Sequence, residues 1–387
     1  MKAGQLWEIF CNVIDNYGDI GVAWRLATDL ATRDQRVRLW VDDASALDWM
    51  APGAMQGRWP RLQVLRWDQA GDFELLANLT PADVWIEAFG CAIPPALVQH
   101  RFGMDAKSPQ ADRPPPIWIN LEYLSAERFV ERAHGLPSPV MTGPAAGHCK
   151  FFFFPGFSNA TGGLIHEAGL ASRKTGFDRS RWLASHGVDW RGEQLVSLFC
   201  YEPKPLAQLL EHWSRAARPT RLLVTHGRAA QAVRAILDRR PSDTPGGSTE
   251  RSNALKINFL QALTQEDFDH LLWACDLNFV RGEDSLVRAI WAENAFVWQI
   301  YPQEDGAHHA KLQALLEEFD APASWRDFHM AWNDVGGPSI DLPDLKSWAR
   351  HAVRIRQRLR RQDDLVSRLL RFVESAPGRG EQRQEKR

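Results

Sequence analysis

The sequence predicts an α/β protein built from two parallel sheets in tandem. Apolar runs of strand length alternate with segments of helical period along most of the 387 residues. This alternation is typical of βα units, whose strands lie parallel in one sheet. It is interrupted at about residues 170–192. At roughly 150 residues per domain, the length suggests two domains, or three.

The first half is expected to contain one sheet, a long surface loop, and a segment to which periodicity assigns no structure. Strands are expected at residues 7–14, 37–41, 62–65, 84–88 and 117–121. After the first strand, Val22, Leu26 and Leu30 recur at the spacing of one helix face and predict a helix. The polar, Pro-rich segment 103–116 is expected to be a surface loop. Periodicity gives no assignment for the Gly-rich segment 143–163, which carries four consecutive Phe residues.

A second series of strands and helices begins near residue 193. Strands are expected at 195–201, 221–225, 256–260, 277–280 and 296–300. Helices are expected at about 205–215, 229–239, 265–274, 284–293 and 308–319. The polar segment 241–253 is expected to be a loop, and 345–373 has the pattern of one long helix or two. The polar tail 376–387 is expected to be disordered.

Composition excludes several classes of protein. The chain has 46 Lys and Arg against 48 Asp and Glu, and a formal net charge of −2. This balance argues against a protein whose overall positive charge attracts nucleic acid or an anionic membrane. The 5 cysteines are scattered, without a Cys-x-x-Cys pair, as suits a reducing compartment. The sequence has no signal-peptide pattern and no apolar run of ~18 residues. We therefore expect a cytoplasmic protein. Its 17 Trp residues have no assigned role.

The first candidate site is the loop that follows the first expected strand. It contains Asp15, Tyr17, Gly18 and Asp19. In an open parallel sheet, ligands bind beyond the carboxyl ends of the strands, near helix N-termini. Two carboxylates there suit general-base work on an amine, hydroxyl or guanidine, and the glycine lets the backbone approach a ligand. Equally, Asp15 could end the strand and Asp19 could cap the helix, and the residues alone leave both interpretations open.

The second candidate site is the turn Arg281-Gly282-Glu283-Asp284-Ser285, between an expected strand and an expected helix. The Arg fork and the Ser hydroxyl, with backbone N–H groups at the helix start, can bind a diphosphate. The two carboxylates also suit the helix dipole, which is a purely structural interpretation. Phosphate-binding and carboxylate groups in one turn favour a site.

Other short patterns carry less weight. The chain has no Gly-x-Gly-x-x-Gly and no Walker motif. Asp267-Phe-Asp269 matches the Asp-x-Asp pattern of metal-dependent sugar transferases, but residues two apart on a helix do not face each other. We expect a helix cap and a surface residue there, and no metal site.

Three segments together resemble one family, the bacterial arginine rhamnosyltransferases that modify translation elongation factor P. They read WEIFCNVIDNYGDIGVAWRLA, RLWVDD and LLWACDLNFVRGEDSLVRAIWAENAFVWQIYPQEDGAHHAKL. The resemblance extends to about residue 375 and implies a GT-B fold, in which two Rossmann-like domains face each other across a cleft. Residues 1–180 would form the acceptor domain and 181–349 the dTDP-sugar domain. The helix at about 350–375 would pack back on the first.

The resemblance also implies a reaction. L-rhamnose would move from dTDP-β-L-rhamnose to an arginine nitrogen of elongation factor P, with inversion and without a metal or cofactor, and would activate the factor. The family's loop aspartates fall on Asp15 and Asp19, with Asp19 at the position of the base, and its catalytic glutamate falls on Glu283. The implied donor contacts are Tyr17, Gly18, Phe199, Tyr201, Gln265, Arg281, Gly282, Asp284, Ser285 and Tyr301. Of these, Phe199 and Tyr201 rest on a shorter motif.

Two alternatives remain at this point. One is another GT-B nucleotide-sugar enzyme, such as a heptosyl-type transferase or an epimerase. The other is a non-catalytic module that binds a translation protein.

Overall fold

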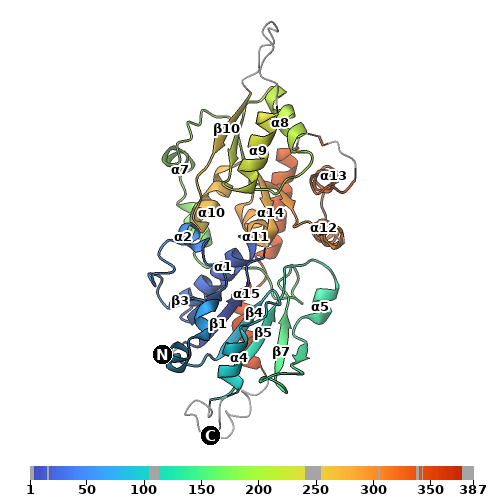
Figure 1. The fold of residues 1–387 in the computed structure, drawn as a ribbon. Helices are drawn as coiled ribbons and strands as arrows, with labels where there is room; N and C mark the ends of the chain where they lie inside the picture. Colours follow the sequence, from blue (N-terminus) through green and yellow to red (C-terminus); the bar gives the residue numbers. More distant parts are fainter. Residues whose placement is uncertain are drawn as a thin grey trace. The chain divides into compact units, whose positions relative to one another are not determined.

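The protein contains two compact units, each built around one sheet (Figure 1). The computed structural model describes residues 4–14, 17–103, 113–239, 254–303, 306–336, 340–341 and 343–376. The first unit contains Met1–Glu167 and Gln362–Arg387, and the second contains Ala168–Arg361. The expected loop 241–253, most of the loop 103–116 and the tail from residue 377 lie outside the described residues.

The sheet of the first unit has seven strands in the order β3-β2-β1-β4-β5-β7-β6. They are β1 (Leu6–Cys11), β2 (Arg36–Val41), β3 (Leu62–Arg66), β4 (Val84–Ala88), β5 (Ile117–Leu121), β6 (Pro137–Pro139) and β7 (Cys149–Phe153). Among the described strands of this sheet, β6 alone pairs antiparallel. The first five strands confirm the prediction, although β1 ends at Cys11 and not at residue 14.

Strand β7 accounts for part of the Phe-rich segment that periodicity left unassigned. Its Phe151 and Phe153 rings meet Phe372 with centroids 5.5 and 5.7 Å apart, whereas Phe152 stacks with Phe154 at 6.0 Å. Successive residues of a strand point to opposite faces, and both faces of β7 carry aromatic rings. The strand therefore lacks the apolar–polar alternation that would have revealed it.

Helices cover both faces of this sheet. The first unit contains α1 (Gly18–Thr32), α2 (Leu47–Met50), η1 (Trp67–Gly71), α3 (Phe73–Asn78), α4 (Pro95–Phe102), α5 (Phe129–Ala133) and α15 (Leu365–Ser375). One core contains the apolar face of α1, including Trp24 and Leu30, together with Leu369 of α15. A second core contains Trp85 and Leu97.

The sheet of the second unit has five parallel strands in the order β10-β9-β8-β11-β12. They are β8 (Gln194–Leu198), β9 (Thr220–Val224), β10 (Leu255–Phe259), β11 (Leu277–Arg281) and β12 (Ala295–Gln299), all at predicted positions. The helices are α6 (Leu170–Thr175), α7 (Arg179–Ser185), α8 (Leu206–Arg215), α9 (Arg228–Asp238), α10 (Gln265–Ala274), α11 (Gly282–Ala292), α12 (Ala307–Glu318), α13 (Ala323–Trp332) and α14 (Leu345–Leu359). Short α6 and α7, and α13, had no predicted counterpart.

Side chains of α13, and of Asn333 directly after it, form hydrogen bonds with the backbone of β12 and Ile300 at the edge of the sheet. The Trp325 Nε1–H donates to the carbonyl of Phe296 (2.6 Å), and the Trp298 N–H donates to His329 Nε2 (3.0 Å). Asn333 accepts from the N–H of Ile300 (2.9 Å) and donates to the carbonyl of Trp298 (2.8 Å). Residues four apart lie on one helix face, so Trp325, His329 and Asn333 replace a neighbouring strand. An edge strand otherwise presents unpaired backbone groups.

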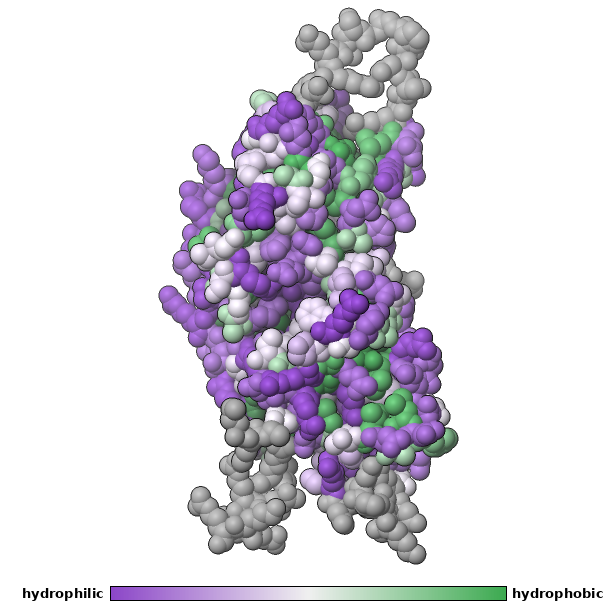
Figure 2. Space-filling view, turned by 90° about the vertical axis from the view of Figure 1, so that its left-hand side faces the viewer, coloured by the Kyte–Doolittle hydropathy of each residue, from purple (hydrophilic) through white to green (hydrophobic). Residues whose placement is uncertain are grey.

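Tryptophans mainly supply core volume. The largest fully buried side chains include Trp7, Trp24, Trp40, Trp85, Trp325, Trp332 and Trp348. In the view of Figure 2, hydrophilic residues dominate the visible surface and hydrophobic residues form separate patches. Among the described residues, none of the helices combines the length and apolar character needed to cross a bilayer.

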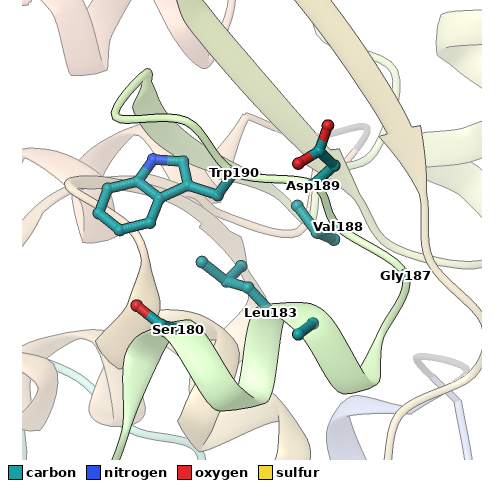
Figure 3. Close-up of a pocket in the computed structure, with 7 residues that line it drawn as sticks. Ser180, Leu183, Gly187, Val188, Asp189 and Trp190 are labelled. Carbon is teal, nitrogen blue, oxygen red and sulfur yellow. The ribbon is translucent and has the colours of Figure 1, made fainter.

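A pocket of about 370 Å³ lies between α7 and the turn at residues 187–190. Its lining includes Leu183 of α7 and Val188, Asp189 and Trp190 of the turn (Figure 3). Of the predicted site residues that the structure describes, none lines this pocket.

The boundaries of the two units differ from the expected ones at residues 180 and 349. Residues 168–180 belong to the second unit because Lys174 of α6 donates to the carbonyl of Ala292 (2.7 Å) and pairs with Glu293 (2.5 Å). Arg356 of α14 pairs with the same Glu293 and keeps that helix in the second unit. Of the expected helix at 350–375, only α15 belongs to the first unit.

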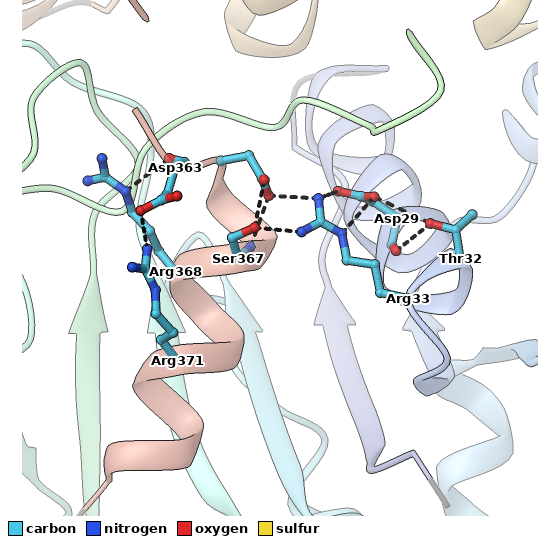
Figure 4. Close-up of polar contacts among 8 residues, drawn as sticks. Asp29, Thr32, Arg33, Asp363, Ser367, Arg368 and Arg371 are labelled. Atoms are coloured by element: carbon cyan, nitrogen blue, oxygen red, sulfur yellow. Dashed lines mark hydrogen bonds and ion pairs between the residues drawn. The ribbon is translucent and has the colours of Figure 1, made fainter. Parts of the chain in front are cut away.

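Helix α15 is separate from α14 and begins at Leu365, where Asp364 caps it by accepting from the N–H of Ser367 at 2.9 Å. Arg33, the residue that follows α1, reaches Asp29 (2.9 Å), Asp364 (2.7 Å) and Ser367 (2.7 Å), and so joins α1 to α15 (Figure 4). The helix continues to Ser375, and Ala376, which was expected to begin a disordered tail, is buried.

Candidate active site

In both sheets, the chain leaves neighbouring central strands in opposite directions along the sheet. These pairs are β1 with β4 in the first unit and β8 with β11 in the second. Ligands of open α/β sheets bind beyond the carboxyl ends of strands at such switch points. Asp19 follows β1, Phe199 and Tyr201 follow β8, and Arg281 ends β11. Sequence-predicted residues therefore lie at both switch points.

Asp19 is a buried carboxylate at the start of α1, with 3% of its surface exposed. Its Oδ2 accepts from the backbone N–H of Ile14 at 2.8 Å, and the Tyr123 hydroxyl lies 3.4 Å from its Oδ1. Tyr17 occupies the cap position of α1 and its side chain makes no capping hydrogen bond. Asp19 thus closes the loop after β1 instead of capping the helix. Asp15 lies outside the described residues.

The other predicted residues of the first loop serve the helix start. The Tyr17 ring packs edge-on against Trp49, with centroids 5.0 Å apart, and its carbonyl accepts from the Gly21 N–H. Gly18 is the first residue of α1. Their assignment as donor contacts stays a prediction.

Phe89 and Tyr123 lie beside this loop and were missed by sequence reasoning. Their rings stack at 4.6 Å with planes 18° apart. Each residue follows a predicted strand, β4 and β5 respectively, and that position was the only available signal.

Arg281 forms the centre of the second site. Its guanidinium carbon lies 4.6 Å from the Phe199 ring centroid and 4.5 Å from that of Tyr201. Nη1 lies 3.4 Å from the carbonyl oxygen of Cys200, and Arg281 is 4% exposed. Aromatic faces attract cations electrostatically. The structure therefore brings these three predicted residues together. Cys200 lies between Phe199 and Tyr201 in the sequence, and burial raises the pKa of its thiol to about 12, so this thiol stays protonated at neutral pH.

Tyr201 is held by Gln299 and Arg228, which the sequence did not reveal, and it also meets the predicted Tyr301. Its backbone N–H donates to Gln299 Oε1 at 2.8 Å, and the Arg228 guanidinium lies 4.8 Å from its ring. Tyr301 meets the same ring edge-on at 5.6 Å and is itself 42% exposed. Arg228 opens α9 directly after β9, at the same edge of the sheet as the other site residues.

The hydroxyl of Ser285 holds the turn between β11 and α11. It accepts from the Arg281 N–H at 3.0 Å and donates to the Arg281 carbonyl. Gly282 has a φ of 65°, which suits glycine, and its carbonyl accepts from Trp298 Nε1 at 2.7 Å. Asp284 lies in the first turn of α11, where a carboxylate complements the helix dipole. Direct diphosphate contact by Ser285 or Asp284 stays a prediction.

Glu283 pairs with Lys311 of α12, with 2.9 Å between Oε1 and Nζ. The two side chains are 17% and 22% exposed, so the pair is largely withdrawn from water. Gln265, the remaining predicted donor contact, is the first residue of α10, and Phe268 of that helix packs edge-on against Phe199 at 5.3 Å.

The aspartates of the Asp-x-Asp pattern turn to different partners. Asp267 interacts with Thr264, the cap of α10, and accepts from Trp182 Nε1 at 3.1 Å. Asp269 was expected on the surface, and that prediction is wrong. Its side chain is 1% exposed, and its two carboxylate oxygens accept from the guanidinium of Arg288 at 2.8 and 2.7 Å. Burial of a charge requires such a partner.

Comparisons with known proteins agree with this architecture. The family described as Elongation-Factor P (EF-P) rhamnosyltransferase EarP matches residues 7–374. A protein-arginine rhamnosyltransferase of Pseudomonas aeruginosa is 41% identical over 391 residues, covering 95% of this chain and 98% of its own. One from Pseudomonas putida is also 41% identical, over 400 residues, covering 97% and 100%.

Solved structures support the same family and fold. A structure reported as the basis for EarP-mediated arginine glycosylation of translation elongation factor EF-P aligns with a TM-score of 0.60 and 28% identity, covering 96% of this chain and 99% of its own. A glycosyltransferase from Rickettsia africae aligns with a TM-score of 0.50 at 7% identity, which concerns the fold alone. The fold is that of GT-B glycosyltransferases, and with this match along nearly its whole length, the chain belongs to the EarP family of elongation factor P rhamnosyltransferases.

Proposed function

We propose that this chain transfers L-rhamnose from dTDP-β-L-rhamnose to an arginine side chain of translation elongation factor P, with inversion at the sugar carbon. Family membership supports the transfer and the acceptor. The observation that carries the donor assignment is the buried Arg281 guanidinium between Phe199 and Tyr201 at a switch point. Since the acceptor is a translation factor, the reaction is placed in the cytoplasm.

The second unit binds the donor in this proposal. Its site combines the partly exposed Phe199 ring, suited to a thymine base, with a buried cation and the N-terminus of α11, suited to a diphosphate. As the bond between sugar and diphosphate breaks, negative charge grows on the leaving dTDP. Arg281 and the helix N-terminus stabilise that charge, so the reaction requires no metal ion.

The first unit activates the acceptor. A guanidinium is protonated at neutral pH and its lone pairs are delocalised, so it is a poor nucleophile. A carboxylate can orient one nitrogen toward the sugar carbon and accept its proton during attack. Asp19 is assigned this role. Its Ile14 hydrogen bond on Oδ2 fixes the carboxylate orientation, with Oδ1 toward Tyr123.

Glu283 is assigned to the reaction as a second carboxylate, held by Lys311. An anion beside the sugar stabilises positive charge that develops on the ring as the leaving group departs. Lys311 fixes the direction of this carboxylate.

The test combines purified protein, elongation factor P and dTDP-β-L-rhamnose, with the mass of the factor as the readout. We expect a gain of one deoxyhexose on an arginine, and an α-linkage by NMR if the reaction inverts. Asp19→Asn should abolish transfer and leave dTDP affinity unchanged. Asp42→Asn is the matched control, because Asp42 is also a loop carboxylate that accepts a backbone N–H, from Val13 at 2.9 Å.

Each outcome bears on one assignment. No mass gain with the unaltered protein rejects the proposed reaction. Normal turnover by Asp19→Asn rejects Asp19 as the base, and a β-linked product rejects inversion.

A further inference from the structure

We propose that Tyr123 and Phe89 form the platform on which the acceptor guanidinium group stacks, beside Asp19. The proposal rests on the proposed function, because it assumes that an arginine side chain enters this site. It assigns a binding role to two residues that the reaction described above does not use.

The platform is an accessible aromatic surface beside a buried carboxylate. Tyr123 is 36% exposed although one face of its ring is stacked on Phe89 at 4.6 Å. Its hydroxyl lies 3.4 Å from Asp19 Oδ1, a long hydrogen bond that ties the edge of the ring to the proposed base. A planar group lying on Tyr123 would therefore have its edge within reach of Asp19.

The backbone is shaped to present these rings. Strands β4 and β5 are neighbours, with Ala88 opposite Leu121, so Phe89 and Tyr123 emerge at the same edge of the sheet. Phe89 has a φ of 59°, a left-handed conformation that costs a bulky residue free energy. Its N–H donates to the Leu121 carbonyl at 2.6 Å, which holds it there. Such strain is retained where surrounding structure enforces it, often at functional sites.

The chemistry of the pair selects a planar cation. Guanidinium groups stack on the faces of aromatic rings through cation–π attraction, and their N–H groups match a carboxylate. The negative charge of Asp19 disfavours a phosphate or carboxylate ligand at the same place. An arginine side chain meets both requirements, and the second unit already uses the same contact where Arg281 lies on Tyr201.

A double-mutant cycle tests the platform without relying on turnover. Binding of elongation factor P is measured calorimetrically for the unaltered protein and for Tyr123→Leu, with the factor carrying either its acceptor arginine or alanine in its place. We expect Tyr123→Leu to weaken binding of the arginine-bearing factor by about tenfold, and to leave binding of the alanine-bearing factor unchanged. Tyr123→Phe keeps the ring and should bind within about twofold of the unaltered protein.

Phe129→Leu is the matched control, because Phe129 is a 46% exposed aromatic residue of the same unit, with its ring against Phe154. It should leave both affinities unchanged, and dTDP affinity should be unchanged in every variant. Equal weakening of both forms of the factor by Tyr123→Leu overturns the platform. If the factor binds but no rhamnose is transferred, the proposed reaction fails and the cycle still decides the platform. If the unaltered protein does not bind the factor, both proposals are overturned.

Discussion

Replacing Arg281 with lysine should weaken dTDP binding even though the positive charge is kept. The guanidinium carbon of Arg281 lies 4.6 and 4.5 Å from the Phe199 and Tyr201 ring centroids. Both distances fall within the ~6 Å range of cation–π attraction. A lysine supplies a point charge without the planar fork, so it can neither stack on both rings nor contact a diphosphate bidentately.

The size of the effect follows from burial. Arg281 is 4% exposed, so its interactions are little screened by water. A hydrogen bond to a charged group contributes about 1.5–3 kcal/mol, and about 1.4 kcal/mol corresponds to a tenfold change in Kd. The loss of one such contact should therefore raise the Kd for dTDP about 10- to 100-fold.

Isothermal titration calorimetry with dTDP measures this change, and thermal unfolding without ligand shows whether the variant is folded. Arg234→Lys is the matched control, since the Arg234 guanidinium carbon lies 4.5 Å from the Phe259 ring in the same unit but Arg234 is exposed and away from the predicted donor residues. A folded Arg281→Lys protein that binds dTDP within about threefold of the unaltered protein would refute the donor assignment.

Three further predictions concern residues that support the sites. Asn333→Ala removes the hydrogen-bond partners of the Ile300 N–H and the Trp298 carbonyl. It should lower the free energy of unfolding, measured in urea, by about 2–4 kcal/mol. A loss below about 1 kcal/mol would contradict the proposed role of Asn333 in pairing the edge of β12. Burial lowers the pKa of His329 to about 4, so its contribution to stability is complete above its unfolded pKa of about 6.5 and is lost as the pH falls toward 4, by about 3 kcal/mol. His329→Gln should flatten the dependence of unfolding free energy on pH over that interval, and an unchanged slope would reject this explanation. Lys311→Met should reduce kcat about 10- to 100-fold through misplacement of Glu283, with dTDP affinity preserved; an unchanged kcat would show that the Lys311 pair does not position Glu283.

The central strands and the positions of the predicted site residues were accessible from the sequence because they depend on short-range pattern. Apolar runs placed β8 and β11, and the parallel arrangement of βα units brings their carboxyl ends to one edge of a sheet. The neighbourhood of Phe199, Tyr201 and Arg281 follows from that arrangement. The resemblance of the motifs to one family added the chemical roles.

Side-chain directions and long-range contacts were not accessible. The direction of the Ser285 hydroxyl toward the Arg281 backbone depends on the geometry of the turn at Gly282, which the sequence pattern does not specify. The contact of Arg33 with Asp364 joins residues 331 positions apart, which leaves no periodic trace. Phe89 adopts a backbone conformation that no local rule predicts for phenylalanine.

In the proposed reaction, both units combine a charged protein group with aromatic rings, and the sign of the charge differs between them. In the second unit the protein supplies the cation, Arg281, between aromatic rings, and the proposed ligand is an anion. In the first unit the protein supplies the anion, Asp19, beside aromatic rings, and the proposed ligand is a cation. The formal net charge of −2 conceals this opposition, because total charge averages over sites of opposite sign. In this proposal each ligand is recognised by charge complementarity within one unit, so changes at Asp19 should alter acceptor affinity alone and changes at Arg281 donor affinity alone. A variant that alters both affinities would show that the two recognition events are coupled and would refute this division.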